Sequence, residues 1–294
     1  MSSVPGFYAE PPHALTGLPA PGRPLVMGVL NVTPDSFSDG GMWLDPAVAV
    51  KHGRQLVAEG ADLVDVGGES TRPGAVRPSE QEELDRVVPV VSALASEGVL
   101  VSVDTMRASV AERAVGAGAV LVNDVSGGRA DERMFATVAR LGTPYVLMHW
   151  RAHSATMQQH AEYADVVADV VRELREQLGH ATEAGVAKER IAIDPGIGFS
   201  KTAEQNWDVL ARMTELHALG HPVLVATSRK RFLGTLLADE AGALRPPLQR
   251  EDATTATSAL AAVCGAWCIR VHAVRATVDA VAVASRWARG VAQR

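Results

Sequence analysis

Eight short apolar runs, separated by longer segments of amphipathic helical pattern, limit the fold of this 294-residue chain more than any other feature. Each run is almost entirely apolar until its last residues, as expected of a strand buried on both faces of a parallel sheet. We predict strands over residues 24–32, 61–68, 99–105, 120–127, 145–149, 191–196, 222–228 and 268–272. Helical pattern occupies 44–60, 79–98 and 107–119, and Ser79 with Glu82 has the spacing of a capping box.

Eight βα units predict an α/β fold of the (β/α)8, or TIM barrel, type. A doubly wound sheet is the alternative, but its usual G-x-G-x-x-G turn does not follow the first apolar run. No linker interrupts the pattern, so we assign residues 24–294 to a single barrel domain. Residues 1–23 are dense in Pro and Gly and predict a short flexible leader.

Composition excludes several classes of protein. Hydrophobic residues make up 47% and charged residues 21%, as in ordinary globular domains. The net charge of −6 argues against nucleic acid as a partner. No apolar run is long enough to span a membrane, and the leader does not read as a signal peptide. Cys264 and Cys268 are too few for a disulfide framework, so we expect reduced thiols and a cytoplasmic protein.

Polar residues gather at the ends of the predicted strands, where barrel enzymes place their active sites. A turn or a helix cap explains any one of them, but eight converging strand ends favour a site. In chain order they are Asn31, Asp65, Glu69, Asp104, Asn123, Asp124, Met148, His149, Asp194, Ser228, Arg270 and His272.

Asp104, Asn123 and Asp194 form an acidic and amide group within this set. Such side chains suit a flat heterocycle with several N–H donors, because a carboxylate accepts two parallel hydrogen bonds from a guanidine-like edge. Each acid also has a structural explanation. Asp194 precedes Pro195 and is a turn former, and Asp104 could cap the helix that starts near Arg107.

Lys230, Arg270 and His272 form a basic group at the ends of the last two strands, the usual phosphate corner of this fold. Ser228 could cap the following helix and leave backbone N–H groups free for an anion. A solvated charge patch is the alternative for the sequence SRKR, residues 228–231.

A resident metal site is not indicated, because His149 and His153 have no carboxylate at ligand spacing. A Mg²⁺ ion shared with a ligand phosphate needs only one or two protein oxygens, and Asn31 could supply one. Asn31 opens onto the polar sequence NVTPDSFSDGG, residues 31–41, which suggests a loop that closes over a polar ligand.

From about Leu25 to Val281 the chain resembles the bacterial dihydropteroate synthases, a family of pterin-binding TIM barrels. The resemblance rests on motifs in the family's order: MGVLNVTPDSFSDGG, DVGGESTRPGA, SVDT, VNDVSGG, LMHW, DPGIGFSKT, SRKRFLG and RVH. The family joins para-aminobenzoate to 6-hydroxymethyl-7,8-dihydropterin pyrophosphate, giving 7,8-dihydropteroate and pyrophosphate in folate synthesis. Sulfonamides compete with para-aminobenzoate, and the family is usually dimeric.

The resemblance implies roles for matching residues. Those for the pterin are Asp104, Asn123, Met148, Asp194, Lys230 and Arg270. Those for pyrophosphate and Mg²⁺ are Asn31, Arg270 and His272, with Asn31 as the metal ligand. Those for para-aminobenzoate are Phe37, Thr71, Arg72, Pro73, Phe199, Ser228 and Lys230. Catalytic roles fall to Asp35, Lys230, Arg270 and His272.

The implied mechanism needs no nucleophilic side chain. Pyrophosphate leaves first, the electron-rich dihydropterin shares the positive charge, and the aromatic amine captures the carbocation. Asp35 would face that cation. The loops after the first two strands would exclude water, with Pro34 and Pro73 limiting their closed shapes.

Two positions depart from the usual family pattern. Ala273 replaces the Asp that usually follows Val-His, which could free or tilt the imidazole of His272. Ala226 replaces a Gly two residues before Ser228. Three alternatives therefore accompany the synthase: a non-catalytic pterin-binding paralogue, a pterin-dependent methyltransferase barrel, and a barrel without a ligand. The segment 254–267 is either an interface helix or plain core.

Overall fold

The computed structural model describes residues 14–33, 45–69, 77–153 and 157–292. All eight predicted strands are present there, each followed by helical structure. The strands are β1 Leu25–Asn31, β2 Leu63–Gly67, β3 Val101–Asp104, β4 Leu121–Asp124, β5 Tyr145–Met148, β6 Ile191–Asp194, β7 Leu224–Val225 and β8 Cys268–Val271. The α-helices are α1 Pro46–Ala58, α2 Glu80–Ser96, α3 Ala108–Gly116, α4 Met134–Leu141, α5 Val166–Glu183, α6 Ala203–Ala211, α7 Met213–His217, α8 Arg231–Leu236, α9 Glu251–Val263 and α10 Val274–Ala292.

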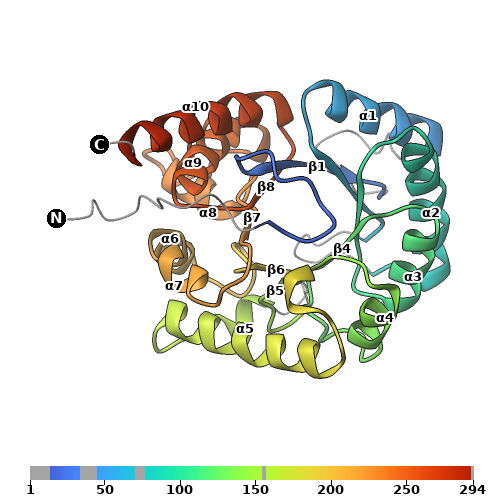
Figure 1. The fold of residues 1–294 in the computed structure, drawn as a ribbon. Helices are drawn as coiled ribbons and strands as arrows, with labels where there is room; N and C mark the ends of the chain where they lie inside the picture. Colours follow the sequence, from blue (N-terminus) through green and yellow to red (C-terminus); the bar gives the residue numbers. More distant parts are fainter. Residues whose placement is uncertain (1–13, 34–44, 70–76, 154–156, 293–294) are drawn as a thin grey trace.

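The strands form one parallel sheet that closes on itself. Their order is β6-β5-β4-β3-β2-β1-β8-β7, and β7 returns to β6 through a parallel bridge between Ile193 and Val223. The amide of Ile193 donates to the carbonyl of Pro222 at 2.8 Å across this seam. Helices surround the ring of strands (Figure 1). The predicted (β/α)8 barrel is therefore confirmed.

The period of two along each strand separates two apolar layers. One set of residues packs outward against the helices, as Val64 and Val66 of β2 do together with Val87 and Leu94 of α2. The alternate set forms a separate cluster inside the barrel, and none of its members among the described residues lies in a helix. Its buried members are Leu15, Leu25, Met27, Leu63, Leu121, Val146, Ala192, Leu224, Ala226, Trp267 and Cys268. We call this cluster the floor.

Leu15 brings part of the predicted leader into the floor. It is fully buried, and the amide of Thr16 donates to the carbonyl of Glu189 just before β6. The guanidinium of Arg23 pairs with Asp62 at 2.7 Å. Figure 1 shows this segment, in dark blue, across the middle of the ring. Residues 14–23 thus differ from the flexible leader that we expected up to residue 23, because an apolar side chain closes the lower end of the barrel.

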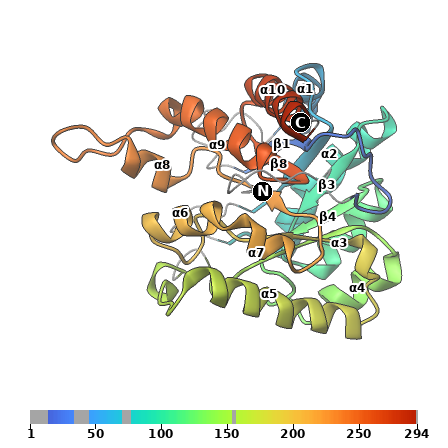
Figure 2. The same ribbon diagram turned by 60° about the vertical axis from the view of Figure 1, so that its left-hand side comes forward.

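The predicted capping box is confirmed: Ser79 and Glu82 form it at the start of α2. Asp45, for which no cap was predicted, caps α1 by accepting from the amide of Ala47. Figure 2 shows the segment between α8 and α9 extending away from the barrel. Within the described ranges, no helix is long and apolar enough to cross a membrane. Neither Cys264 nor Cys268 is in a disulfide.

Candidate active site

On β2, β4, β6 and β8, a polar side chain follows the floor residue after two more residues, about 6.6 Å along the strand. The pairs of floor and polar residues, two positions apart on one strand, are Leu63 and Asp65, Leu121 and Asn123, Ala192 and Asp194, and Cys268 and Arg270. We call this upper layer the rim. Because all strands are parallel, their C-terminal ends meet at one end of the barrel.

Asp65 is the centre of the rim, although we assigned it no role from the sequence. Its Oδ2 atom accepts from Nδ2 of Asn123 at 3.0 Å and from Nε of Arg270 at 2.6 Å. Its Oδ1 atom is buried and has no hydrogen-bond partner among the described residues. The signal was available in the sequence, because Asp65 ends an apolar run at the same inward position as Asp104 and Asp194.

Arg270 joins two carboxylates. Besides Asp65, its Nη2 atom donates to Oδ2 of Asp104 at 2.7 Å. Burial raises the pKa of Asp104 to about 8. The charge of Arg270 opposes this rise, and the charge of Asp65 adds to it. A guanidinium is a planar set of N–H donors, so this contact shows that Asp104 can pair with a flat donor edge. Asp104 does not cap α3, whose first amide, that of Ala108, bonds to Asp131 instead.

Asn31 lies beside this acidic group. A Cβ atom placed on Gly67 would lie 3.5 Å from Oδ2 of Asp104 and 3.7 Å from Oδ1 of Asn31. The two side chains therefore flank the same backbone position at the end of β2. Within the described ranges, no group of three or more metal-ligating side chains gathers. Any Mg²⁺ held by Asn31 would take most of its ligands from water and a bound phosphate.

Asp194 and Lys230 form the other side of the rim. Burial raises the pKa of Asp194 against the opposing charge of Lys230, and burial lowers the pKa of Lys230 to about 8. The Lys230 ammonium donates to the carbonyl of Ile197 and lies 4.9 Å from the ring centre of Phe199. Asp194 also accepts from the amide of Gly196 at 2.7 Å. The turn-forming explanation of Asp194 is thus confirmed alongside its place in the rim.

Gly198 gives Lys230 its path into the rim. A Cβ atom on Gly198 would lie 2.9 Å from Cδ of Lys230, and the residue has a φ of +83°. Both the space and the left-handed backbone favour glycine. The motif residues GIGF, 196–199, therefore shape the lysine side of the site.

The prediction that Ser228 caps the next helix was wrong. The N-cap residue of α8 is Lys230, without a side-chain cap, and α8 begins too late for Ser228 to reach it. Instead the hydroxyl of Ser228 lies 2.9 Å from Nδ1 of His272 and accepts from the His272 amide at 3.2 Å. His272 is thus held by Ser228, although Ala273 stands where the family usually has Asp. The imidazole is not freed by this departure.

Met148 belongs to a small apolar cluster next to the rim. It is 2% exposed and packs with Met106 and Val125, and the partly buried Trp150 and Phe199 pack against them. This cluster is separate from the floor and from the layer under the helices. It offers an apolar wall beside the acidic group, as a flat aromatic ligand requires.

His149 turns away from a metal-binding role. It is 3% exposed, and its Nε2 atom lies 2.9 Å from Oε2 of Glu173. One ring nitrogen of His149 is thus already paired with a carboxylate. Five predicted residues lie outside the described ranges, namely Asp35, Phe37, Thr71, Arg72 and Pro73.

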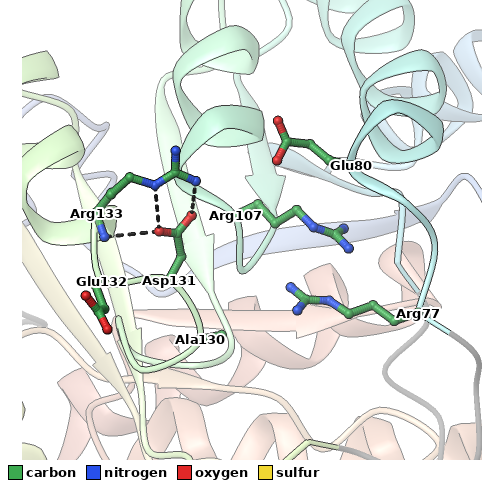
Figure 3. Close-up of a pocket in the computed structure, with 7 residues that line it drawn as sticks. All are labelled: Arg77, Glu80, Arg107, Ala130, Asp131, Glu132 and Arg133. Atoms are coloured by element: carbon green, nitrogen blue, oxygen red, sulfur yellow. Dashed lines mark hydrogen bonds and ion pairs between the residues drawn. The ribbon is translucent and has the colours of Figure 1, made fainter.

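An open hollow of about 420 Å³ lies beside the rim (Figure 3). None of its lining residues was predicted for the site, and its three arginines each pair with a carboxylate. Asp131 pairs with Arg133 at 3.0 Å, and Nε of Arg77 donates to Glu69 at 3.0 Å. Arg107 contacts both Glu69 and the buried Glu83. The hollow therefore has no unpaired arginine to attract an anion.

The comparisons with known proteins agree with the chemistry of the rim. The profile of a family described as Pterin binding enzyme matches residues 27–272, which places the chain among pterin-binding enzymes. The dihydropteroate synthase of Mycobacterium leprae is 56% identical over 263 residues, covering 89% of this chain and 93% of that protein. The chain belongs to the dihydropteroate synthase family.

Two solved structures extend the similarity to three dimensions. The dihydropteroate synthase of Xanthomonas albilineans with 4-aminobenzoic acid has a TM-score of 0.81 and 46% identity, covering 89% of this chain and 92% of that one. The Yersinia pestis enzyme in a sulfonamide drug complex has a TM-score of 0.84 and 43% identity, with coverage of 90% and 94%.

Proposed function

We propose that this chain is a dihydropteroate synthase, a transferase that joins para-aminobenzoate to 6-hydroxymethyl-7,8-dihydropterin pyrophosphate in folate biosynthesis. One observation carries the proposal: the acids and amide of β2, β3, β4 and β6 meet Arg270 and Lys230 in one rim. That arrangement supplies acceptors for a pterin ring and cations for a diphosphate. The family membership gives the pairing of substrates.

In this proposal the pterin takes the acidic side of the rim. Asp104, Asn123 and Asp194 accept from its N–H groups, Lys230 donates to it, and Met148 lies against it. Arg270 packs on the ring, and the ligand's donor edge adds to the contact that Asp104 already makes with the guanidinium. Both buried acids then stay hydrogen-bonded, which limits the cost of binding.

Pyrophosphate would lie between Asn31, Arg270 and His272. The sequence-derived prediction of Mg²⁺ belongs to this part of the proposal. A single amide oxygen suits Mg²⁺, which keeps several waters and shares phosphate oxygens. The ion would neutralise charge on the departing diphosphate. Calorimetric titration of pyrophosphate with and without Mg²⁺ tests this role, and equal affinity in both would contradict it.

Para-aminobenzoate would enter beside Phe199, with its carboxylate near Lys230 and Ser228. Phe37, Thr71, Arg72 and Pro73 complete this pocket in the prediction from the sequence. The Xanthomonas albilineans structure contains 4-aminobenzoic acid, and the Yersinia pestis structure is a complex with a sulfonamide drug. We therefore expect sulfonamides to compete with para-aminobenzoate here as well. Inhibition that high para-aminobenzoate fails to relieve would contradict this expectation.

The rim residues would act by binding and by electrostatics. Arg270 and His272 stabilise the leaving diphosphate, and such prearranged groups commonly contribute several kcal/mol to lowering a barrier. Asp35 is proposed to face the pterin carbocation, which the neutral aromatic amine then captures. Holding that amine against the reactive carbon adds a proximity contribution.

An assay of pyrophosphate release tests the function directly. Release should need both substrates, and mass spectrometry should find 7,8-dihydropteroate in equal amount. A non-catalytic paralogue would bind the pterin, as calorimetry detects, yet release no pyrophosphate. A pterin-dependent methyltransferase would bind a methylated pterin and ignore para-aminobenzoate.

A homodimer and a cytoplasmic location complete the proposal. Large exposed apolar side chains concentrate on the α8 to α10 region: Leu236, Leu248, Leu260, Val283 and Trp287 are each 55–66% exposed. Segment 254–267 is partly core, since Ser258 and Ala261 are buried, and its exposed side chain Leu260 supports the proposed interface. Exposed apolar patches favour an interface. Light scattering should give twice the chain mass, and Leu260→Asp should reduce it.

A further inference from the structure

A lysine that no predicted role uses lies buried behind the rim. Lys201 is 3% exposed, and its ammonium reaches three acceptors. They are Nδ1 of His149 at 3.1 Å, the carbonyl of Gly196 at 3.1 Å and the carbonyl of Phe199 at 3.2 Å. A protonated lysine has three N–H donors, so this geometry satisfies all of them.

The hydrogen bonds of His149 to Lys201 and Glu173 determine its tautomer. Because Lys201 donates to Nδ1, the ring proton lies on Nε2 and is donated to Glu173 at 2.9 Å. Burial lowers the pKa of His149 to about 3, which keeps the imidazole neutral and able to accept. Arg151 also donates to Glu173, at 3.0 Å through its Nε atom. The acceptor for Lys201 is thus anchored to α5.

The turn of residues 195–200 carries three groups that face the rim. The amide of Gly196 donates to Asp194, the carbonyl of Ile197 accepts from Lys230, and the Phe199 ring lies beside the Lys230 ammonium. Lys201 bonds to both ends of this turn, at Gly196 and Phe199. One ammonium therefore connects the lysine of the site to the aromatic wall next to it.

We propose that Lys201 is a positioning residue for the para-aminobenzoate side of the site, because its ammonium fixes the turn that sets Phe199 and Lys230. It touches neither substrate. The charge of Lys201 also acts on Asp194, where it opposes the burial that raises the pKa of that carboxyl, as the charges of Lys230 and Arg270 do. The inference rests on the proposed function, in which Phe199 and Lys230 contact the aminobenzoate.

Lys201→Met tests the inference, since it keeps the length of the side chain and removes its three hydrogen bonds. We expect the KM for para-aminobenzoate to rise about tenfold, as befits the loss of buried hydrogen bonds to a charged group. The turnover number should fall less than threefold. Lys188→Met makes the same chemical change at an exposed lysine of the 3-10 turn before β6, and should leave both constants within twofold.

A pH profile separates positioning from general structural damage. Asp194 must be ionised to pair with pterin N–H donors. Loss of the Lys201 charge raises the pKa of Asp194 further. The affinity for pterin is lost as pH falls through that pKa, so the loss should begin at higher pH in Lys201→Met than in the wild type. Burial lowers the pKa of Lys201 to about 7, so the wild type carries this charge on the acid side of that pH. The other groups around Lys201 and Asp194, namely Glu173, Arg151, Lys230 and Arg270, remain in place, and the titration of Asp104 is common to both proteins.

Each result decides the matter. An unchanged KM for para-aminobenzoate in folded Lys201→Met, or an unmoved acid limb of pterin affinity, would overturn the inference. If that variant does not fold, His149→Phe replaces it. This change removes the one acceptor of Lys201 that lies outside the turn, and the KM for para-aminobenzoate should rise two- to threefold. An unchanged value there would equally overturn it. Calorimetry with pterin needs no turnover, so failure of the synthase assay in the wild type would refute only the proposed function.

Discussion

The floor and the rim are adjacent layers of the same barrel, two residues apart on β2, β4, β6 and β8, and they differ in almost every physical respect. In the floor, Leu121 and Leu63 are fully buried among apolar neighbours, and Leu15 closes the end of the barrel. In the rim, Asp65 and Asp104 are buried and Arg270 is largely buried, yet all three are ionisable groups. Burial stabilises the first layer and costs free energy in the second. The barrel therefore places its stability and its proposed chemistry in adjacent layers of one sheet.

The largest expected effect concerns the floor. Leu121→Ala removes a fully buried side chain and should lower the free energy of unfolding by about 3 kcal/mol, through lost transfer energy and a cavity. The KM values for both substrates should stay within twofold. Urea unfolding and steady-state kinetics measure the two quantities. Leu248→Ala, at a side chain that is 55% exposed, is the control and should cost less than about 0.5 kcal/mol.

A large rise in KM in the Leu121 variant would break the separation between the two layers. It would mean that the inward side chains pack as one unit, so that a cavity in the floor displaces Asn123 two residues further along β4.

A smaller but still large effect is expected in the rim. Asp194→Asn exchanges a carboxylate for an amide against the same donors, and pterin affinity should fall by about 2 kcal/mol. The free energy of unfolding should stay level or rise, because the amide oxygen can still accept from Gly196 and a buried group with a raised pKa is removed. Calorimetry and urea unfolding test both statements.

Asp85→Asn is the matched control for Asp194→Asn, because Asp85 is exposed on α2. It should change neither quantity beyond experimental error. Unchanged pterin affinity in Asp194→Asn would remove this carboxylate from the site, whatever happens to stability.

A third effect is the release of a proton. Asp104 has a pKa of about 8 in the free protein, so at pH 7 it is mostly protonated. A donor edge on the ligand favours the carboxylate and lowers this pKa, so pterin binding at pH 7 should release about one proton. At pH 9 the group is already ionised and release should vanish.

Calorimetry in two buffers with different ionisation heats counts these protons. Asp104→Asn should abolish the release, while Asp85→Asn should preserve it. Proton uptake at pH 7, or release that persists at pH 9, would show that Asp104 does not titrate on binding.

Sequence reasoning reached the barrel, because buried parallel strands give continuous apolar runs and the helices begin with recognisable caps such as Ser79. It also found the strand-end residues Asp104, Asn123, Asp194, Lys230 and Arg270. Contacts across the barrel could not be predicted from the spacing of residues in the sequence. Asp65 as the shared acceptor, Leu15 in the floor and Lys201 behind the turn all depend on contacts between residues far apart in the chain.

Ser228 shows how a local rule can mislead. A serine before a helical segment is a natural N-cap, but α8 begins at Arg231, and Arg229 adopts a left-handed φ of +59° that separates Ser228 from the helix. The hydroxyl therefore turns to His272 on the neighbouring strand. His272, which directly follows β8, is the partner of Ser228 instead of the helix. A capping rule considers only residues close in the sequence, so it could not predict this contact.

The smallest expected effect tests that contact. Ser228→Ala removes the partner of His272 Nδ1 and should lower turnover by about fivefold, the size of one neutral hydrogen bond. Ala273→Asp restores the residue that the family usually has, and should change turnover less than twofold, because Ser228 already orients the imidazole. Steady-state kinetics on both variants, with pterin affinity as a check of binding, gives the comparison. A gain of fivefold or more in Ala273→Asp would mean that Ser228 holds His272 poorly, and that the rim lost part of its chemistry with the missing carboxylate.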